Sequence, residues 1–227
     1  MLSTHLAMPR EGHLQQVYHI FAYLKAKPKR TLAFDPQHPD IDEARFVKYD
    51  WRDFYRGAME AIPGDAPRPR GNVASTHCFV DADHAGNCVT RCSQTGILLF
   101  LNRAPIIWYS KRQNTVETST FGSEFVAMRI AVELIEALRY KLRMFGIPLD
   151  GPTNVFCDNE AVTKNATIPE STLKKKHNSI AYHRAREAVA AETIQVAKED
   201  GSTNLADVLT KLLPQATKEF LCDRFMY

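Results

Sequence analysis

The run THCFVDA at residues 76–82 decides the fold, together with two runs that follow it, TGILLFLN at 95–102 and PIIWYSK at 105–111. Each has the length of a strand, and the third is rich in β-branched and aromatic residues. Asn102 and Arg103, followed by an Ala-Pro pair, suit a short turn between the second and third runs. The sequence therefore predicts a sheet that begins with antiparallel strands.

The elements farther along the chain predict helices that cross over between additional strands. A wide apolar stripe over residues 121–145, ended by Gly146 and Pro148, is typical of a long helix buried against a sheet. The remaining predicted elements are strands over 153–157 and 193–198 and helices over 159–166, 172–191 and 204–213. This order is typical of an α/β fold with a mixed five-stranded sheet flanked by helices.

The first 70 residues differ in character from the rest. Apolar residues recur at helical spacing over 12–26 and predict an amphipathic helix that Pro28 ends, and residues 31–34 suit a short strand. The run PGDAPRPRG at 63–71 is typical of a linker. We therefore expect three parts: an N-terminal part over 1–70, a main domain over 71–215 and a C-terminal extension over 216–227.

The composition is that of an ordinary globular chain and excludes several classes of protein. Hydrophobic residues make up 44% and charged residues 24% of the 227 residues, which excludes a disordered chain. The five cysteines are an odd number and do not match the paired framework of a small secreted scaffold. The apolar run Ile97–Leu101 is far short of the ~20 residues that a membrane span needs, and the N-terminus lacks the apolar core of a signal peptide. We therefore expect an intracellular protein without a membrane segment.

Four acidic residues stand where the predicted elements meet. They are Asp81 in the first strand, Glu124 in the first turn of the long helix, Asp158 at the end of the fourth strand and Asp207 in the first turns of the last helix. The helix dipole explains Glu124 and Asp207, and Asp158 suits a plain N-cap. Asp81 is harder to explain in structural terms, because a buried charge is costly unless it is paired or bound to a metal.

The joint arrangement of these acids predicts a metal site. If the first and fourth strands are neighbours, Asp81 and Asp158 lie side by side, and the sequence places no obvious arginine or lysine next to either. Carboxylates without cationic partners repel one another, and their hard oxygens suit Mg²⁺ or Mn²⁺. Two such ions about 4 Å apart are the usual device for in-line cleavage of a phosphodiester. The acids therefore favour phosphodiester chemistry.

Seven segments carry a more specific pattern. In order, they are FVDADHAG (79–86), TRCSQTG (90–96), WYSKRQNTVETST (108–120), GSEFVA (122–127), CDNEAV (157–162), KKKHNSIAYHRARE (174–187) and NLADVLTKLLP (204–214). Together they resemble the ribonuclease H domain of the Pol polyproteins of copia-type LTR retrotransposons, over about residues 72–215. The segment HLQQVYHIFAYLK (13–25) resembles the helix that leads from the polymerase region into ribonuclease H. The resemblance implies that residues 1–70 are a remnant of the reverse-transcriptase tail or connection, with a linker.

The resemblance also implies an active site made of the same four acids, Asp81, Glu124, Asp158 and Asp207. By this analogy Asp81 would bridge two Mg²⁺ ions, with Mn²⁺ as the alternative metal. Glu124 and Asp158 would complete one ion, and Asp207 the other. The implied reaction is hydrolysis of the RNA strand of an RNA–DNA hybrid during reverse transcription. Asp83 is the nearest rival of Asp81, because strand alternation puts both on the same face.

The implied partners are the RNA–DNA hybrid, the reverse transcriptase and other Pol domains. The implied location is cytoplasmic, in virus-like particles, and also nuclear. The chain departs from the family where His84 replaces the usual tryptophan and where Phe121-Gly122-Ser123 lacks an acidic residue before Glu124. A catalytically silent nucleic-acid-binding or connection-like remnant of a decayed element is the alternative, and the missing polymerase supports it.

A basic segment predicts contacts with the phosphates of nucleic acid. The net charge of +3 is too mild to indicate such a partner by itself. The candidates are Lys174, Lys175, Lys176, His177, His183 and Arg184, with Arg186 in the same segment, and Lys111, Arg112 and Gln113 after the third strand. A solvated helix face is the alternative for the basic segment. Asn159 suits either a hydrogen bond to the RNA backbone or a 2′-hydroxyl, or a simple cap of the short helix.

Overall fold

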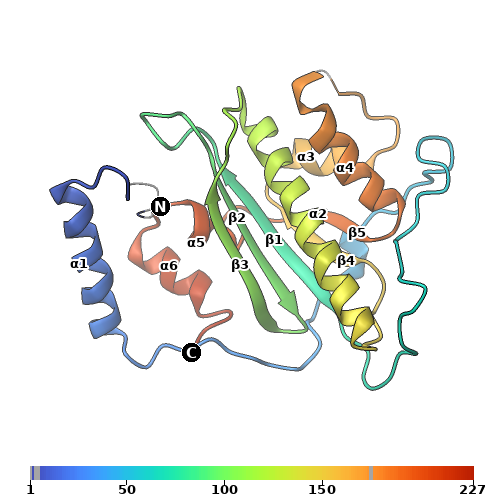
Figure 1. Ribbon diagram of the computed structural model, residues 1–227, viewed down its shortest axis with the longest axis horizontal. Coiled ribbons are helices and arrows are strands. Elements are labelled where there is room, and N and C mark those ends of the chain that lie inside the picture. The colour runs from blue at the N-terminus through green and yellow to red at the C-terminus, as the bar shows by residue number, and fades with distance from the viewer. Residues whose placement is uncertain (1, 3–5, 174–175) are drawn as a thin grey trace.

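One mixed sheet of five strands forms the centre of the computed structural model, in the order β3-β2-β1-β4-β5 (Figure 1). The structure describes residue 2, residues 6–173 and residues 176–227. The strands are β1 (Thr76–Asp83), β2 (Gln94–Leu101), β3 (Ala104–Arg112), β4 (Thr153–Cys157) and β5 (Ile194–Lys198). β2 pairs antiparallel with β1 and β3, whereas β4 pairs parallel with β1 and β5. The predicted α/β fold and the predicted hairpin are confirmed.

Helices lie on both faces of this sheet (Figure 1). The helices of the described chain are α1 (Glu11–Ala26), which lies beyond α6 and away from the sheet, α2 (Thr120–Met144), α3 (Glu160–Thr167), α4 (Ser179–Ala190), α5 (Asp207–Thr210) and α6 (Gln215–Cys222), with the 3₁₀ turns η2 (Glu43–Arg45) and η3 (Lys176–Asn178). α2, α3 and α4 pack on one face, and α5 and α6 on the other. No helix in the described part of the chain is both long and apolar enough to cross a membrane.

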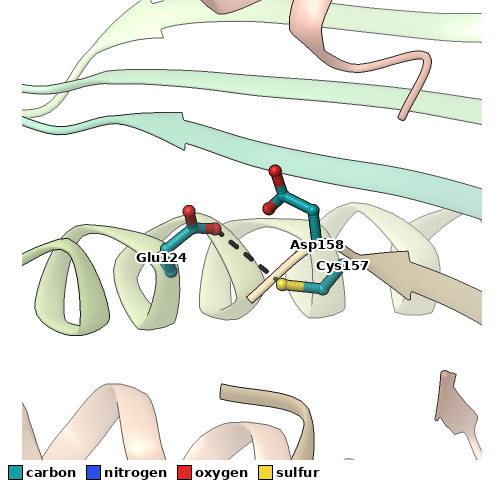
Figure 2. Close-up of side chains that lie close together, drawn as sticks. All are labelled: Glu124, Cys157 and Asp158. Carbon is teal, nitrogen blue, oxygen red and sulfur yellow. Dashed lines mark hydrogen bonds between the residues drawn. The ribbon is translucent and has the colours of Figure 1, made fainter. Parts of the chain in front are cut away.

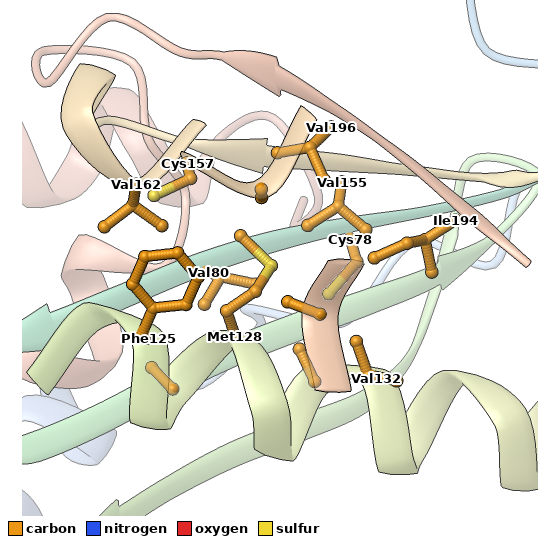
Figure 3. Packing of buried hydrophobic residues seen from close by; sticks show 14 of the residues in the cluster. Cys78, Val80, Phe125, Met128, Val132, Val155, Cys157, Val162, Ile194 and Val196 are labelled. Atoms are coloured by element: carbon orange, nitrogen blue, oxygen red, sulfur yellow. The ribbon is translucent and has the colours of Figure 1, made fainter. Parts of the chain in front are cut away.

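The main hydrophobic core lies between the sheet and α2 (Figure 3). Strand alternation turns Cys78 and Val80 of β1 toward this side. The apolar stripe that the sequence predicts on α2 supplies Phe125 and Met128, which are both fully buried. Each such side chain contributes about 1.5–3 kcal/mol by burial. This packing fixes the start of α2, and with it Glu124, against the middle of β1.

A second, smaller core lies on the other face of the sheet, where the C-terminal extension packs. Leu98 and Phe100 of β2 belong to one buried cluster with Leu221 of α6 and Phe225. Leu221 is fully buried. Residues beyond 215 therefore contribute apolar burial to the fold.

The N-terminal part packs along the outside of the sheet and its helices. α1 forms where the sequence predicts it, but none of its residues is buried. Residues 31–33 hydrogen-bond to residues 225–227, so the short strand predicted over 31–34 is only an isolated bridge. Farther along, Glu60 accepts hydrogen bonds from Arg139 of α2 at 2.6 and 2.8 Å. Because Arg139 is buried, this charge pair fixes the N-terminal part to the main domain.

The second long helix is shorter than predicted. It was expected over 172–191, but α4 begins only at Ser179. Arg186 on α4 is buried and donates hydrogen bonds to the carbonyl oxygens of Ile168 and Pro169 at 2.8 and 2.6 Å. These bonds hold the chain after α3 as a loop. Arg186 is therefore a structural residue and does not belong to an exposed basic face.

The last predicted helix, over 204–213, is much shorter than expected, and a separate helix follows it. α5 spans only Asp207–Thr210, and α6 begins at Gln215, after Pro214. Proline has no backbone N–H to donate and clashes with the preceding turn, so one continuous helix cannot run through it. As a result, Lys211 stands directly after α5 in an extended conformation.

Candidate active site

The ends of two parallel strands bring two of the predicted acids together. Val80 of β1 pairs with Cys157 of β4, so the next residues, Asp81 and Asp158, lie beside each other. Asp207 reaches the same place from the start of α5. One carboxylate oxygen from each of these three aspartates lies within 4.8 Å of the other two. Such a spacing suits a shared cation.

Glu124 approaches Asp158 from α2 (Figure 2). Its carboxylate, the Cys157 thiol and the Asp158 carboxylate offer atoms that all lie within 4.8 Å of one another. The thiol of Cys157 donates a long hydrogen bond of 3.8 Å to Oε2 of Glu124. Glu124 was predicted in the first turn of the long helix, but α2 begins at Thr120 and Glu124 lies beyond its first turn. The helix dipole therefore does not account for this residue. The structure thus brings all four acids to one place.

These carboxylates are largely withdrawn from water. Asp81 is 1% exposed, and Glu124 and Asp207 are each 6% exposed. The side chain of Asp158 is 18% exposed. Asp158 is therefore the most open of the four acids, and the site meets solvent on its side.

A lysine that the sequence reasoning missed lies among these acids. The Nζ atom of Lys211 is 2.7 Å from Asp207 and 3.2 Å from Asp81. The same atom is 3.9 Å from Asp158. The expectation that neither Asp81 nor Asp158 has a basic neighbour is therefore wrong. The signal that could have found it is the four-residue spacing of Asp207 and Lys211, since residues four apart lie on one helix face.

Burial and mutual repulsion raise the pKa values of these acids. Burial, together with the charges of Asp81 and Asp158, raises the pKa of Glu124 to about 9. Burial also raises the pKa of Asp207 to about 6, although the hydrogen bond from Lys211 acts against it. For Lys211, burial acts to lower the pKa, but the hydrogen bond to Asp207 and the surrounding carboxylates outweigh it and raise the pKa. Without a metal, the cluster therefore keeps a proton on Glu124 at neutral pH.

The metal-free protein is expected to lose stability as the pH rises. The pKa of Glu124 is about 9 in the folded chain, against an ordinary value of 4.5. The folded state therefore holds a proton that the unfolded chain has released, and this contribution is full below about pH 4.5 and lost as the pH rises through about 9. Thermal unfolding in EDTA should show a Tm that falls across this window. In Glu124→Gln the fall should be much smaller; an equal fall in both proteins would contradict the assignment to Glu124.

Asp83, the rival of Asp81, lies two residues farther along β1 and is half-buried. Its carboxylate lies against the backbone of Gly86, where an added Cβ would come within 1.8 Å of Oδ2. In the described part of the chain, Asp83 is in neither group of converging ligand atoms. The geometry therefore favours Asp81 over Asp83 as a metal ligand.

Two of the predicted nucleic-acid contacts have structural roles. Gln113 is buried and donates from Nε2 to Thr95 and to the carbonyl oxygen of Ser123. Its side chain therefore does not face solvent, and the expected phosphate contact is wrong. Oδ1 of Asn159 accepts hydrogen bonds from the backbone at the start of α3, which is the capping alternative.

The other residues predicted to contact nucleic acid are more exposed to solvent. Lys111, Lys176, His177 and His183 are exposed, while Arg112 and Arg184 are half-buried. Arg184 forms ion pairs with Glu136 and Glu187, and His183 shares a hydrogen bond of 2.6 Å with the hydroxyl of Tyr55. Lys174 and Lys175 lie outside the described residues. Among the predicted contacts that the structure describes, Lys111 and Lys176 are therefore the exposed lysines.

Comparisons with known proteins come from sequence and from structure. No protein-family model matches the chain. It is 28% identical over 212 residues to the retrovirus-related Pol polyprotein from transposon RE1 of Arabidopsis thaliana, covering 93% of this chain and 12% of that protein. It is 33% identical over 192 residues to the corresponding polyprotein from transposon TNT 1-94 of Nicotiana tabacum, covering 78% of this chain and 14% of that protein. The chain thus spans about an eighth of the length of these relatives.

Solved structures of ribonucleases H are similar at low sequence identity. LC11-RNase H1, solved in complex with an RNA/DNA hybrid, matches with a TM-score of 0.48 and 16% identity, over 60% of this chain and 94% of that chain. The N-terminal RNase H domain of a Mycobacterium tuberculosis protein, solved as a fusion with maltose-binding protein, matches with a TM-score of 0.46 and 11% identity, over 66% of this chain and 97% of that chain.

The strand order and directions of the sheet, with Asp81 within β1 and Asp158 directly after the neighbouring β4, define a ribonuclease H-like α/β protein. By sequence, the chain is a relative of the Pol polyproteins of copia-type retrotransposons. The resemblance that the seven motifs predict is therefore confirmed over most of the chain.

Proposed function

We propose that this chain hydrolyses the RNA strand of RNA–DNA hybrids, as the ribonuclease H part of a retrotransposon Pol polyprotein. The observation that carries the proposal is the convergence of Asp81, Glu124, Asp158 and Asp207 at one end of the sheet. Buried carboxylates that repel one another are costly to fold, so a site that keeps four of them points to cation-dependent chemistry. The relationship to Pol polyproteins supports the choice of a nucleic-acid substrate.

The donor set fits divalent cations. Asp81, Asp158 and Asp207 offer hard carboxylate oxygens within 4.8 Å of one another, the ligand type that Mg²⁺ and Mn²⁺ prefer. Burial and the charge of Glu124 raise the pKa of the Cys157 thiol well above its usual range, which favours the neutral thiol in the metal-free site. We assign the four acids to two Mg²⁺ ions, with Mn²⁺ as the alternative. When bound there, two such ions would supply activation of a water molecule and stabilisation of the leaving 3′ oxygen.

The chain's own residues prepare this chemistry. The packing of Phe125 and Val80 in the main core fixes the spacing between Glu124 on α2 and Asp81 on β1. From β4, the thiol of Cys157 donates a hydrogen bond to the Glu124 carboxylate. Asp158 lies on the open side of the site, where the scissile phosphate would approach. The carboxylates are therefore preorganised before substrate binds.

Binding of the hybrid is assigned to the exposed basic residues. Lys111 and Arg112 are the last two residues of β3, and Lys176 and His177 precede α4. Their positive charges suit phosphates, so affinity should fall as salt rises. The amide group of Asn159, next to Asp158, is the candidate contact for a 2′-hydroxyl. Other domains of the Pol polyprotein, above all the reverse transcriptase, are the proposed protein partners.

A panel of matched duplexes tests the substrate. The same sequence is prepared as RNA–DNA hybrid, as RNA duplex and as DNA duplex, with each strand labelled in turn. The proposal expects cleavage of the RNA strand of the hybrid and no cleavage of either DNA strand. Cleavage of duplex DNA would contradict it and would favour another nuclease on the same fold.

A further inference from the structure

We propose that Lys211 is a built-in counter-cation that occupies the carboxylate site and must move aside before a divalent cation can bind. The inference rests on the metal site of the proposed function, but not on nuclease activity. It starts from the position of Lys211. This lysine is the first residue after the short helix α5, and its Nζ lies among Asp81, Asp158 and Asp207.

The lysine takes up ligand atoms that a metal would need. Oδ1 of Asp81 accepts from Nζ of Lys211 at 3.2 Å, while Oδ2 accepts from the hydroxyl of Thr210. Oδ1 of Asp207 accepts a hydrogen bond from the same ammonium group at 2.7 Å. A cation that binds Asp81 and Asp207 therefore competes directly with Lys211 for the same oxygens.

The electrostatics support an exchange of cations. Among the described residues, Lys211 is the only basic side chain within 4.0 Å of any of the four acids. It offsets one charge of a cluster whose members repel each other, whereas a divalent cation offsets two. The lysine therefore stabilises the metal-free site and at the same time weakens metal binding.

The side chain of Lys211 can move from the carboxylates into solvent. The Lys211 side chain is 38% exposed, and the next residue, Leu212, is 94% exposed. The flexible four-carbon stem of a lysine can swing its ammonium into water without repacking a core. The movement needs no change in β1 or β4.

The test is a titration of the chelator-stripped full chain with MgCl₂ and MnCl₂ by isothermal calorimetry. Lys211→Met should bind Mg²⁺ about tenfold more tightly than the wild type, because the competing ammonium is gone. Lys211→Arg, which keeps a cation there, should not gain affinity. Lys164→Met is the matched control, because Lys164 forms a similar pair with Glu160 four residues away, at 2.6 Å, on an exposed helix face.

A second readout separates this role from a merely structural one. Without metal, Lys211→Met should unfold at a lower temperature than the wild type, and Mg²⁺ should restore more of its Tm than it adds to the wild type. If the variant folds only with metal, it is purified in MgCl₂ and its affinity is measured by competition with a fluorescent chelator. Equal or weaker Mg²⁺ affinity in Lys211→Met would overturn the inference. Tighter binding in a chain that leaves hybrids intact would support it while contradicting the proposed nuclease.

Discussion

Asp158→Asn is expected to lower the rate of hybrid cleavage by about a thousandfold or more while leaving the fold intact. Asp158 is the member common to both groups of converging ligand atoms, so it links Glu124 with Asp81 and Asp207. Asparagine keeps the shape but removes the charge that a cation requires. Because the lost charge is one of several that repel each other, the metal-free variant should unfold at the wild-type temperature or above it. Cleavage of the labelled RNA strand and thermal unfolding measure the two effects.

Asp83→Asn is the matched control for this loss. Asp83 lies near the cluster, and burial and the charge of Asp81 raise its pKa, but its carboxylate lies against Gly86. Its substitution should change the rate by less than about tenfold. Equal losses in Asp83→Asn and Asp158→Asn would contradict the ligand set assigned here.

Arg186→Met is expected to lower the free energy of unfolding by about 3 kcal/mol or more. Nη1 and Nη2 of Arg186 donate to the carbonyl oxygens of Asn165, Ile168 and Pro169, at 2.6–2.8 Å, and bind the hydroxyl of Ser171. Methionine would leave these buried and part-buried acceptors without the guanidinium donors. Urea unfolding measures the change.

The packing of the Arg186 guanidinium adds to this loss. It lies 4.8 Å from the ring centres of both Trp51 and Tyr182, so the substitution also removes cation–π contacts. Arg184→Met is the control two residues away, since Arg184 forms only partly exposed ion pairs and should cost about 1 kcal/mol or less. Similar losses in the two variants would show that Arg186 is not the anchor of the α3–α4 loop.

The sheet and the long helix could be predicted because their signals are local. The runs that became β1, β2 and β4 differ from the predicted ranges by one residue at most, and α2 is displaced by one. Apolar periodicity is set by burial on one face, so it survives in the sequence. The start of α4 was predicted wrongly because Arg186 donates hydrogen bonds to the carbonyl oxygens of Ile168 and Pro169, and no local sequence pattern reveals such bonds.

The acids were predictable, but their environment was not. Asp81 stands out because it interrupts an apolar strand. Its place beside Asp158 depends on the pairing of β1 with β4, which the sequence left as a condition and the structure meets. The four-residue spacing accounts for the contact of Lys211 with Asp207, but its contacts with Asp81 and Asp158 depend on how α5 packs beside β1 and β4, which no local pattern reveals. Gln113 was misjudged for a similar reason: a polar residue after a strand resembles a surface contact until its partners Thr95 and Ser123 are known.

The metal-dependent ribonuclease activity is tested by cleavage of a hybrid whose RNA strand carries a 5′ label. The wild-type chain is incubated with it in MgCl₂, and again after addition of EDTA. We expect RNA fragments with 3′-hydroxyl ends in Mg²⁺ and an intact RNA strand in EDTA. An intact RNA strand in Mg²⁺, at protein concentrations where the hybrid is bound, would contradict it and would favour a silent nucleic-acid-binding remnant.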